Sequence, residues 1–145
     1  MFTTHFPLVE VAQIRAAREV WRWMQRFEGP QILAGDLNCE PNSKTYKFLT
    51  GKIQLEDGLK GDLIDAFETL SIDDNLKDIN TFLSWKPSKR IDFFLFRNVD
   101  HNLSVSHPHV LDEPSCLDPS LECPEESAAS DHRAISIRLE RRKSA

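Results

Sequence analysis

The feature that most constrains the fold is a change in the spacing of apolar residues along the chain. From Leu8 to Phe27 they recur every three or four residues, which predicts one long amphipathic helix. Gly29-Pro30 ends this helix, and Gln31 to Ala34 is a short apolar run typical of a buried strand. Later the spacing becomes that of strands, over Thr81 to Trp85 and Arg90 to Phe96. This order predicts an α+β or layered α/β/α domain in which helices cover sheets.

The remaining predicted elements are shorter. They are a brief helix capped by Asn42 or Ser43, a helix over 63–70, strands over 103–106 and 134–139, and a proline-rich surface loop over 107–129. At 145 residues the chain has room for one modest domain, which we expect over 1–140 with a basic tail over 141–145.

Composition excludes several classes of protein. The net charge of -5 argues against a protein that binds nucleic acid mainly by coating its phosphates with positive charge. No run approaches the roughly 20 apolar residues of a transmembrane helix, and the N-terminus lacks the pattern of a secretory signal. The odd cysteine count (Cys39, Cys116 and Cys123) makes a disulfide framework a poor explanation. We therefore expect an intracellular, cytoplasmic protein in a reducing compartment.

Short polar clusters stand at the edges of the predicted elements. They are TTHF with His5, GDLN with Asp36 and Asn38, RIDFFLF with Asp92, and SDHRAI with Asp131 and His132. Each cluster alone has a simpler explanation, because Asp and Asn after a strand commonly form turns and Asp92 could pair with Lys89 or Arg90.

Asp92 is the hardest of these residues to explain structurally. It interrupts an apolar strand, where a buried carboxylate is costly unless it is paired or hydrogen-bonded. His132 is a natural partner, since a carboxylate fixes the tautomer of an imidazole and favours its charged form. With Asp131 as a hard oxygen ligand, Asp36 to orient water and Asn38 as a neutral donor, the set suits attack on a phosphate beside a divalent ion.

The ordered set TTHF, GDLNCEPNS, RIDFFLF and SDHRAI resembles the C-terminal half of the endonuclease/exonuclease/phosphatase superfamily. This superfamily includes pancreatic deoxyribonuclease, AP endonucleases, deadenylases, inositol polyphosphate 5-phosphatases and neutral sphingomyelinases. The resemblance implies a layered α/β/α two-sheet sandwich of the DNase-I type. It also implies a monomeric, magnesium-dependent hydrolase of phosphoric esters, with manganese as the other candidate metal. The substrate would be a nucleic acid, an inositol phosphate or a phospholipid headgroup.

The resemblance also implies roles for the first three site residues. His5 matches the histidine that contacts or protonates the phosphate side. Asp36 would orient and deprotonate the attacking water, and Asn38 would hydrogen-bond a phosphoryl oxygen.

The same resemblance gives roles to the later residues. Asp92 would support His132, which steadies the charge growing on phosphorus, and Asp131 would hold the metal. From their places beside these motifs, we expect Trp85 to line a substrate cleft, although core packing explains it equally well. Arg90 would meet a substrate phosphate from a small basic rim, where a solvated surface is the alternative.

One departure from the family pattern leaves the function open. The family supplies an Asn and a metal-binding Glu from its first half, and this chain has no match for either. We therefore expect a partial domain, and two alternatives to the hydrolase stay open: a catalytically inactive truncated member of the family, or a small α/β binding domain. The stretch GDLNCEPNSKTYKFLT is similar to neutral sphingomyelinases and to deadenylases, so it does not identify the substrate.

Overall fold

A computed structural model describes residues 1–69, 78–99, 103–111 and 130–141. In chain order the elements are β1 (Phe2–His5), α1 (Glu10–Met24), β2 (Gln31–Asp36), α2 (Lys44–Leu49), β3 (Ile64–Asp65), the 3-10 helix η1 (Ala66–Thr69), β4 (Asp92–Arg97), β5 (Leu103–Val110) and β6 (Ile135–Arg141). Within the described residues, no helix has the length and hydrophobicity needed to span a bilayer.

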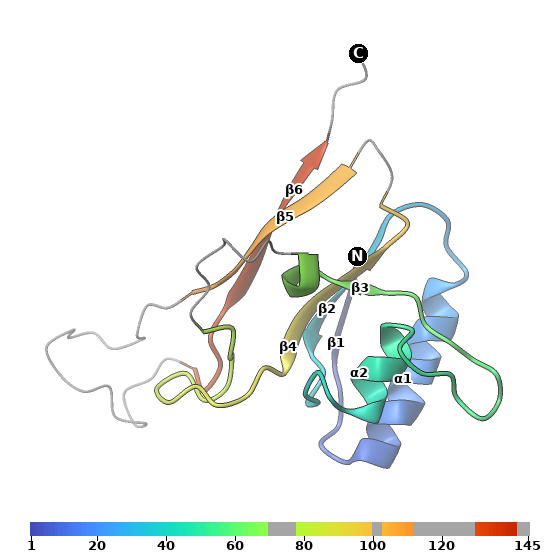
Figure 1. Ribbon diagram of the computed structural model, residues 1–145, viewed down its shortest axis with the longest axis horizontal. Helices are drawn as coiled ribbons and strands as arrows, with labels where there is room; N and C mark the ends of the chain where they lie inside the picture. Colours follow the sequence, from blue (N-terminus) through green and yellow to red (C-terminus); the bar gives the residue numbers. More distant parts are fainter. Residues whose placement is uncertain (70–77, 100–102, 112–129, 142–145) are drawn as a thin grey trace, which may run out of the picture.

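The elements form three layers. A four-stranded sheet of order β1-β2-β4-β3 lies in the middle, with α1 and α2 on one face and the β5-β6 pair on the other (Figure 1). β1 runs parallel to β2, whereas β4 is antiparallel to both β2 and β3. The prediction of a layered α+β fold with two sheets is therefore confirmed.

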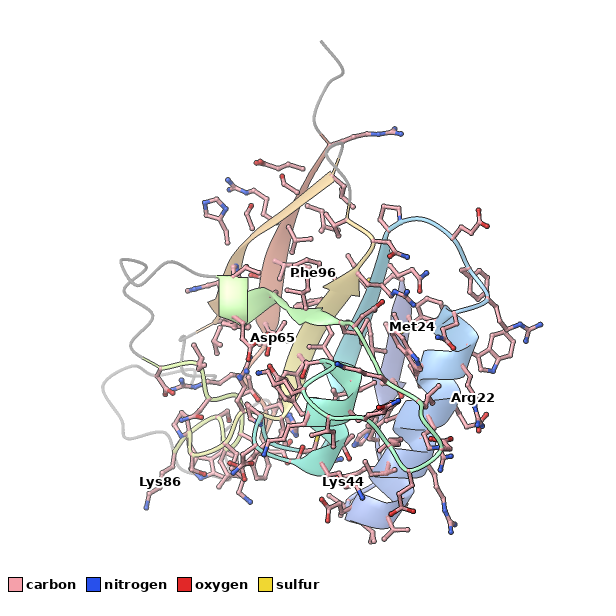
Figure 2. The ribbon with its side chains drawn as sticks, turned by 45° about the vertical axis from the view of Figure 1, so that its right-hand side comes forward. Arg22, Met24, Lys44, Asp65, Lys86 and Phe96 are labelled. Carbon is pink, nitrogen blue, oxygen red and sulfur yellow. The ribbon has the colours of Figure 1, made fainter. Side chains whose placement is uncertain are left out.

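Each face of the central sheet packs on its own hydrophobic core. Along β4, Phe93 and Leu95 join the larger core beneath the helices, whereas Phe94 and Phe96 join the smaller core beneath β5-β6. This alternation follows from the strand period of two. In Figure 2, Phe96 points toward the β5-β6 pair and Met24 points from α1 toward the sheet.

Both predicted N-terminal helices are present, with shorter bounds. α1 begins at Glu10 and ends at Met24, and it buries Ala17, Trp21 and Met24 against the sheet at the spacing expected for one helix face. At α2 the hydroxyl of Ser43 accepts a hydrogen bond from the backbone N–H of Tyr46, at 3.1 Å. Ser43 is therefore the N-cap, and the alternative of Asn42 is wrong.

Three predicted elements differ in the structure. The helix expected over 63–70 is instead β3 followed by η1, because the carboxylate of Asp65 accepts the N–H of Phe67 and turns the chain; Leu70 lies outside the described residues. The strand expected from Thr81 to Trp85 is only a pair of isolated bridges, from Phe82 to Lys89 and to His132. Residues 107–110 of the expected loop are instead part of β5, which continues to Val110.

Residues 112–129, with Cys116 and Cys123, lie outside the described part of the chain, as do 142–145 of the expected tail. The first residue of that tail, Arg141, is the last residue of β6.

The register of the central sheet decides which polar residues are neighbours. His5 pairs with Asp36 across β1 and β2, and Asp36 pairs with Asp92 across β2 and β4. Gly35 permits this approach, because a Cβ atom there would lie 1.9 Å from the carbonyl oxygen of Thr4.

Candidate active site

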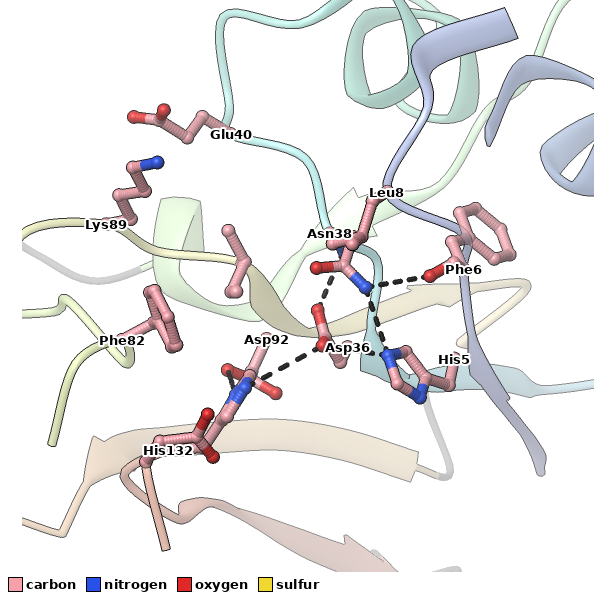
Figure 3. Close-up of a pocket in the computed structure, with 12 residues that line it drawn as sticks. His5, Phe6, Leu8, Asp36, Asn38, Glu40, Phe82, Lys89, Asp92 and His132 are labelled. Atoms are coloured by element: carbon pink, nitrogen blue, oxygen red, sulfur yellow. Dashed lines mark hydrogen bonds and ion pairs between the residues drawn. The ribbon is translucent and has the colours of Figure 1, made fainter. Parts of the chain in front are cut away.

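The polar clusters meet at one edge of the central sheet. Because β1 and β2 are parallel, both end at this edge, and the antiparallel β4 begins there. The edge opens into a cavity of about 870 Å³ (Figure 3). Its lining residues are His5, Phe6, Leu8, Asp36, Asn38, Glu40, Phe82, Lys89, Ile91, Asp92, Asp131 and His132. The structure thus brings together six of the predicted site residues, from His5 to His132.

His132 lies between two carboxylates. Its Nδ1 is 2.8 Å from Oδ2 of Asp92, and its Nε2 is 3.8 Å from Oδ2 of Asp36. Burial lowers the pKa of His132, but the hydrogen bond and charge of Asp92 outweigh it, so that the pKa is raised above its ordinary value. The imidazole is therefore biased toward its charged form, with Nε2 facing the cavity.

Asp36 is the central carboxylate of the cluster. Its Oδ1 accepts the backbone N–H of Asn38 at 2.7 Å, and its Oδ2 lies 3.3 Å from Nε2 of His5. Burial raises the pKa of Asp36, and the facing carboxylate of Asp92 raises it further against the opposing effects of the hydrogen bond and the histidines. A carboxylate with a raised pKa is a stronger base than an ordinary aspartate.

Asn38 follows the end of β2 with a left-handed backbone, at φ +48°. Asn adopts this conformation more readily than most residues. Its side-chain amide donates to the carbonyl oxygen of Phe6 at 2.8 Å and lies 3.0 Å from Nε2 of His5. These contacts aim the amide at the same side of the cavity as His5.

A short segment before β4 holds the start of that strand and the loop of His132 together. The hydroxyl of Thr81 accepts the backbone N–H groups of Ile91 and Asp92, at 3.2 and 3.3 Å. The carbonyl of Thr81 accepts the N–H of Arg133 at 2.7 Å. The ring of Phe82 lies 5.2 Å from the imidazole of His132. Asp92 and His132 are therefore anchored to one common support.

Sequence reasoning missed several lining residues, namely Leu8, Glu40 and Phe82. Leu8 and Glu40 carried no signal beyond their closeness to His5 and Asn38. Phe82 belonged to an expected strand, and only its bridge to His132 brings it to the cavity.

Two predicted substrate contacts are not brought to the cavity. Arg90 is buried, and its guanidinium pairs with Asp65 at 2.8 Å instead of forming an accessible rim. Its expected place on that rim is wrong, because the segment that leads into β4 carries it into the protein, where it pairs with the buried Asp65. Trp85 does not line the cavity either.

The donor set of the cavity fits a divalent cation. Asp36, Asp92 and His132 each offer one ligand atom, and these atoms all lie within 4.8 Å of one another. The carboxylates can bind a cation while His132 is charged, whereas His132 could join them only as the neutral imidazole. Burial and, to a lesser degree, the facing carboxylate of Asp92 raise the pKa of Asp36, and a cation would relieve the repulsion between the two carboxylates. Oxygen donors suit magnesium or manganese. Asp131 adds a further exposed carboxylate to the lining.

Solved structures share the fold. A mannosyl-6-phosphatase of Bacteroides thetaiotaomicron matches with a TM-score of 0.65 and 20% identity, over 94% of this chain and 49% of that one. An endonuclease/exonuclease/phosphatase protein of the same species gives 0.64 and 20%, over 94% and 48%. One from Bacteroides vulgatus gives 0.63 and 21%, over 95% and 48%. The chain thus spans about half the length of each structure.

Sequence comparison identifies the family. A search of curated proteins finds no match. The family model described as "Endonuclease/Exonuclease/phosphatase family" matches residues 3–132, a span that begins just before His5 and ends at His132. This match agrees with the three-layered fold and with the polar residues gathered at one edge of its central sheet. The chain therefore belongs to the endonuclease/exonuclease/phosphatase family.

Proposed function

We propose that the chain carries part of the active site of a metal-dependent phosphoric-ester hydrolase. The observation that supports this most directly is the placement of His132 between Asp92 and Asp36 in one cavity. A base, a charged donor and metal-binding carboxylates within one cavity are what phosphoryl transfer to water requires. Residues 1–140 would form one part of a single domain.

In the proposed reaction, Asp36 orients a water molecule and takes its proton as the water oxygen attacks phosphorus. The bond from phosphorus to the ester oxygen breaks, and that oxygen leaves as an alcohol after taking up a proton from solvent, to which Asp36 then releases the proton it took. The raised pKa of Asp36 favours the proton transfer. A cation held by carboxylates of the cavity, with Asp131 as the predicted ligand, would neutralise charge on the phosphate.

His132 and Asn38 would bind the phosphoryl oxygens. The Nε2–H of a charged His132 points into the cavity, where it can donate to an oxygen that gains charge in the transition state. Both amide hydrogens of Asn38 are engaged, with the carbonyl of Phe6 and with Nε2 of His5. A phosphoryl oxygen that accepts from the amide of Asn38 would take the place of Nε2 of His5. The imidazole of His5 would then lie beside the bound phosphate.

The substrate class is proposed no further than a phosphoric ester. The B. thetaiotaomicron structure is described as a mannosyl-6-phosphatase, so a phosphomonoester belongs in a substrate panel beside nucleic acids, inositol phosphates and sphingomyelin.

One observation favours a second function, namely binding of a phosphoric ester without its hydrolysis. The chain spans about half the length of the solved structures that it matches. The Asn and metal-binding Glu that the resemblance assigns to the family's first half have no match in the residues given. The alternative of an unrelated small α/β binding domain is at odds with the family match over residues 3–132.

The test is hydrolysis by the purified chain. Bis-p-nitrophenyl phosphate, p-nitrophenyl phosphate and the natural panel would be assayed with Mg²⁺, with Mn²⁺ and with EDTA. We expect metal-dependent product release that Asp36→Asn abolishes and Asp57→Asn retains, because Asp57 pairs with Arg18 outside the cavity. Equal rates in wild type and Asp36→Asn would refute the role of Asp36. A folded wild-type chain that binds inorganic phosphate without any turnover would favour the second function.

A further inference from the structure

Gln13 is a buried polar residue on α1 that belongs to none of the polar clusters at the strand ends. Gln13 is only 4% exposed to solvent. Its side-chain amide donates to the carbonyl oxygen of Asn38 at 2.7 Å and to that of Leu8 at 3.2 Å. Gln13 itself does not line the cavity, but both of the residues that it holds do.

These two hydrogen bonds join the two loops that form one wall of the cavity. Leu8 lies in the loop between β1 and α1, and Asn38 lies in the loop between β2 and α2. An amide group has two N–H bonds, and Gln13 gives one to each loop. No other uncharged side chain of this length has two N–H donors, so glutamine suits a position that is almost closed to water.

With Gln13, both backbone polar groups of Asn38 are hydrogen-bonded. The backbone N–H of Asn38 is bound by Asp36, and its side-chain amide by Phe6 and His5. The backbone carbonyl of Asn38 is its other backbone polar group, and Gln13 binds it. Together these contacts hold Asn38 at φ +48°, a backbone conformation that sets the direction of its side chain.

We propose that Gln13 is a positioning residue for the phosphate-binding side of the active site. It would fix the backbone of Asn38 from behind, so that the amide of Asn38 meets a phosphoryl oxygen in the correct orientation. This inference rests on the proposed function, in which Asn38 binds that oxygen. Gln13 would influence substrate affinity although it never touches the substrate.

Gln31 provides a matched control for the loss of a buried glutamine. It is 3% exposed, and its side-chain amide donates to the carbonyl oxygen of Phe27 at 2.6 Å. It lies at the beginning of β2, whereas Asp36 and the cavity lie at the end of that strand. Replacing either glutamine by Met keeps the length of the side chain and removes its donors. Both changes should therefore destabilise the fold, but only one should disturb Asn38.

The experiment compares Gln13→Met with Gln31→Met in the full chain. The first measurement is the backbone and side-chain amide signals of Asn38 in ¹⁵N-labelled protein. The second is the dissociation constant of inorganic phosphate in the presence of Mg²⁺, together with KM and kcat for the best ester of the panel.

We expect Gln13→Met to shift both Asn38 signals and to raise the dissociation constant and KM by about tenfold. This is the value of one hydrogen bond to a charged group, here the bond from the amide of Asn38 to a phosphoryl oxygen. Gln31→Met should leave the Asn38 signals in place and change affinity by less than about twofold, since it lies apart from the site. Equal behaviour of the two variants would overturn the proposal.

The two measurements separate this proposal from the proposed function. If the wild-type chain neither binds phosphate nor hydrolyses an ester, the proposed function fails, and the Asn38 signals alone decide whether Gln13 positions that residue. If Gln13→Met does not fold, Gln13→Asn replaces it, because the shorter amide keeps its donors but draws them back from Asn38. Unchanged Asn38 signals in that variant would count against the proposal.

Discussion

Two aspartates of the central sheet, Asp92 on β4 and Asp65 on β3, meet opposite kinds of partner. Asp92 is 15% exposed at its side chain and binds the imidazole of His132, which faces the cavity. The side chain of Asp65 is fully buried, and it binds the guanidinium of Arg90 at 2.8 Å and the hydroxyl of Tyr46 at 2.7 Å. Asp92 thus pairs with a group that can exchange a proton with solvent, whereas Asp65 has no exposure to solvent.

The difference lies in the partner's chemistry. An arginine does not exchange its proton near neutral pH, so the buried ion pair of Asp65 and Arg90 suits a structural link. Burial raises the pKa of Tyr46 well above its ordinary value, and the charge of Asp65 raises it further, so Tyr46 always acts as a donor. A histidine titrates near neutral pH, so the pair of Asp92 and His132 can take part in a reaction.

The largest effect is expected on activity when the cavity loses its base. Asp36→Asn should lower the rate of ester hydrolysis by about 10²- to 10⁴-fold, because the amide cannot take the proton of water. Its free energy of unfolding should stay close to that of wild type or rise slightly, since burial and Asp92 both disfavour the charge at this position. Steady-state kinetics and urea unfolding would be measured on the same preparation. A variant that lost stability and activity together would place Asp36 with Asp65 as a structural residue.

The next effect is expected on stability when the buried ion pair is broken. Asp65→Asn should lower the free energy of unfolding by about 3–5 kcal/mol, because it leaves the charge of Arg90 buried without a counter-charge. The matched variant Asp92→Asn should cost about 1 kcal/mol or less, since its pair is partly exposed. Urea unfolding at fixed pH measures both. Equal losses would remove the distinction between the two aspartates.

A smaller effect is expected when Asp65 keeps its ion pair and loses only a hydrogen bond. Tyr46→Phe should cost about 1.5–3 kcal/mol, the usual contribution of a hydrogen bond to a charged group. Because Tyr46 does not line the cavity, KM for an ester substrate should not change. An increase in KM would mean that the buried network also shapes the substrate site.

The smallest effect is expected in the pH dependence of stability. The pKa of His132 is raised in the folded state, so its pair with Asp92 contributes fully below the unfolded value of 6.5. This contribution disappears as pH rises through the higher folded pKa. In EDTA, the free energy of unfolding should therefore fall by about 1 kcal/mol or less above pH 6.5. His132→Gln should remove that part of the slope, and an unchanged slope would show that the pair does not titrate there.

The sequence was sufficient to predict the parts of the fold that depend on local spacing. α1, α2 and β4 follow from the periods of their apolar residues and from the cap at Ser43. The contact between Asp92 and His132 was also foreseen, because an isolated carboxylate in an apolar strand needs a partner. The catalytic roles of these two residues stay predictions.

The sequence was not sufficient where distant contacts override local preference. The segment DLIDAFETL has the composition of a helix, but Arg90, just before β4, holds Asp65 by an ion pair, and the chain turns there instead. For the same reason Arg90 looked like a surface cation and is a buried one. Gln13 gave no signal at all, because its partners Leu8 and Asn38 are recognised only once the loops are folded.

The pairing of His5 with Asp36, and of Asp36 with Asp92, makes the site depend on strand alignment as strictly as on any side chain. A slip of β4 by one residue would exchange Phe93 and Leu95 with Phe94 and Phe96 between the two cores. All four are large and apolar, so either alignment would bury comparable surface, but only one brings the two carboxylates together. Insertions or deletions of a single residue in β2 or β4 should therefore produce chains that still bury their apolar residues but no longer bring Asp36 and Asp92 together.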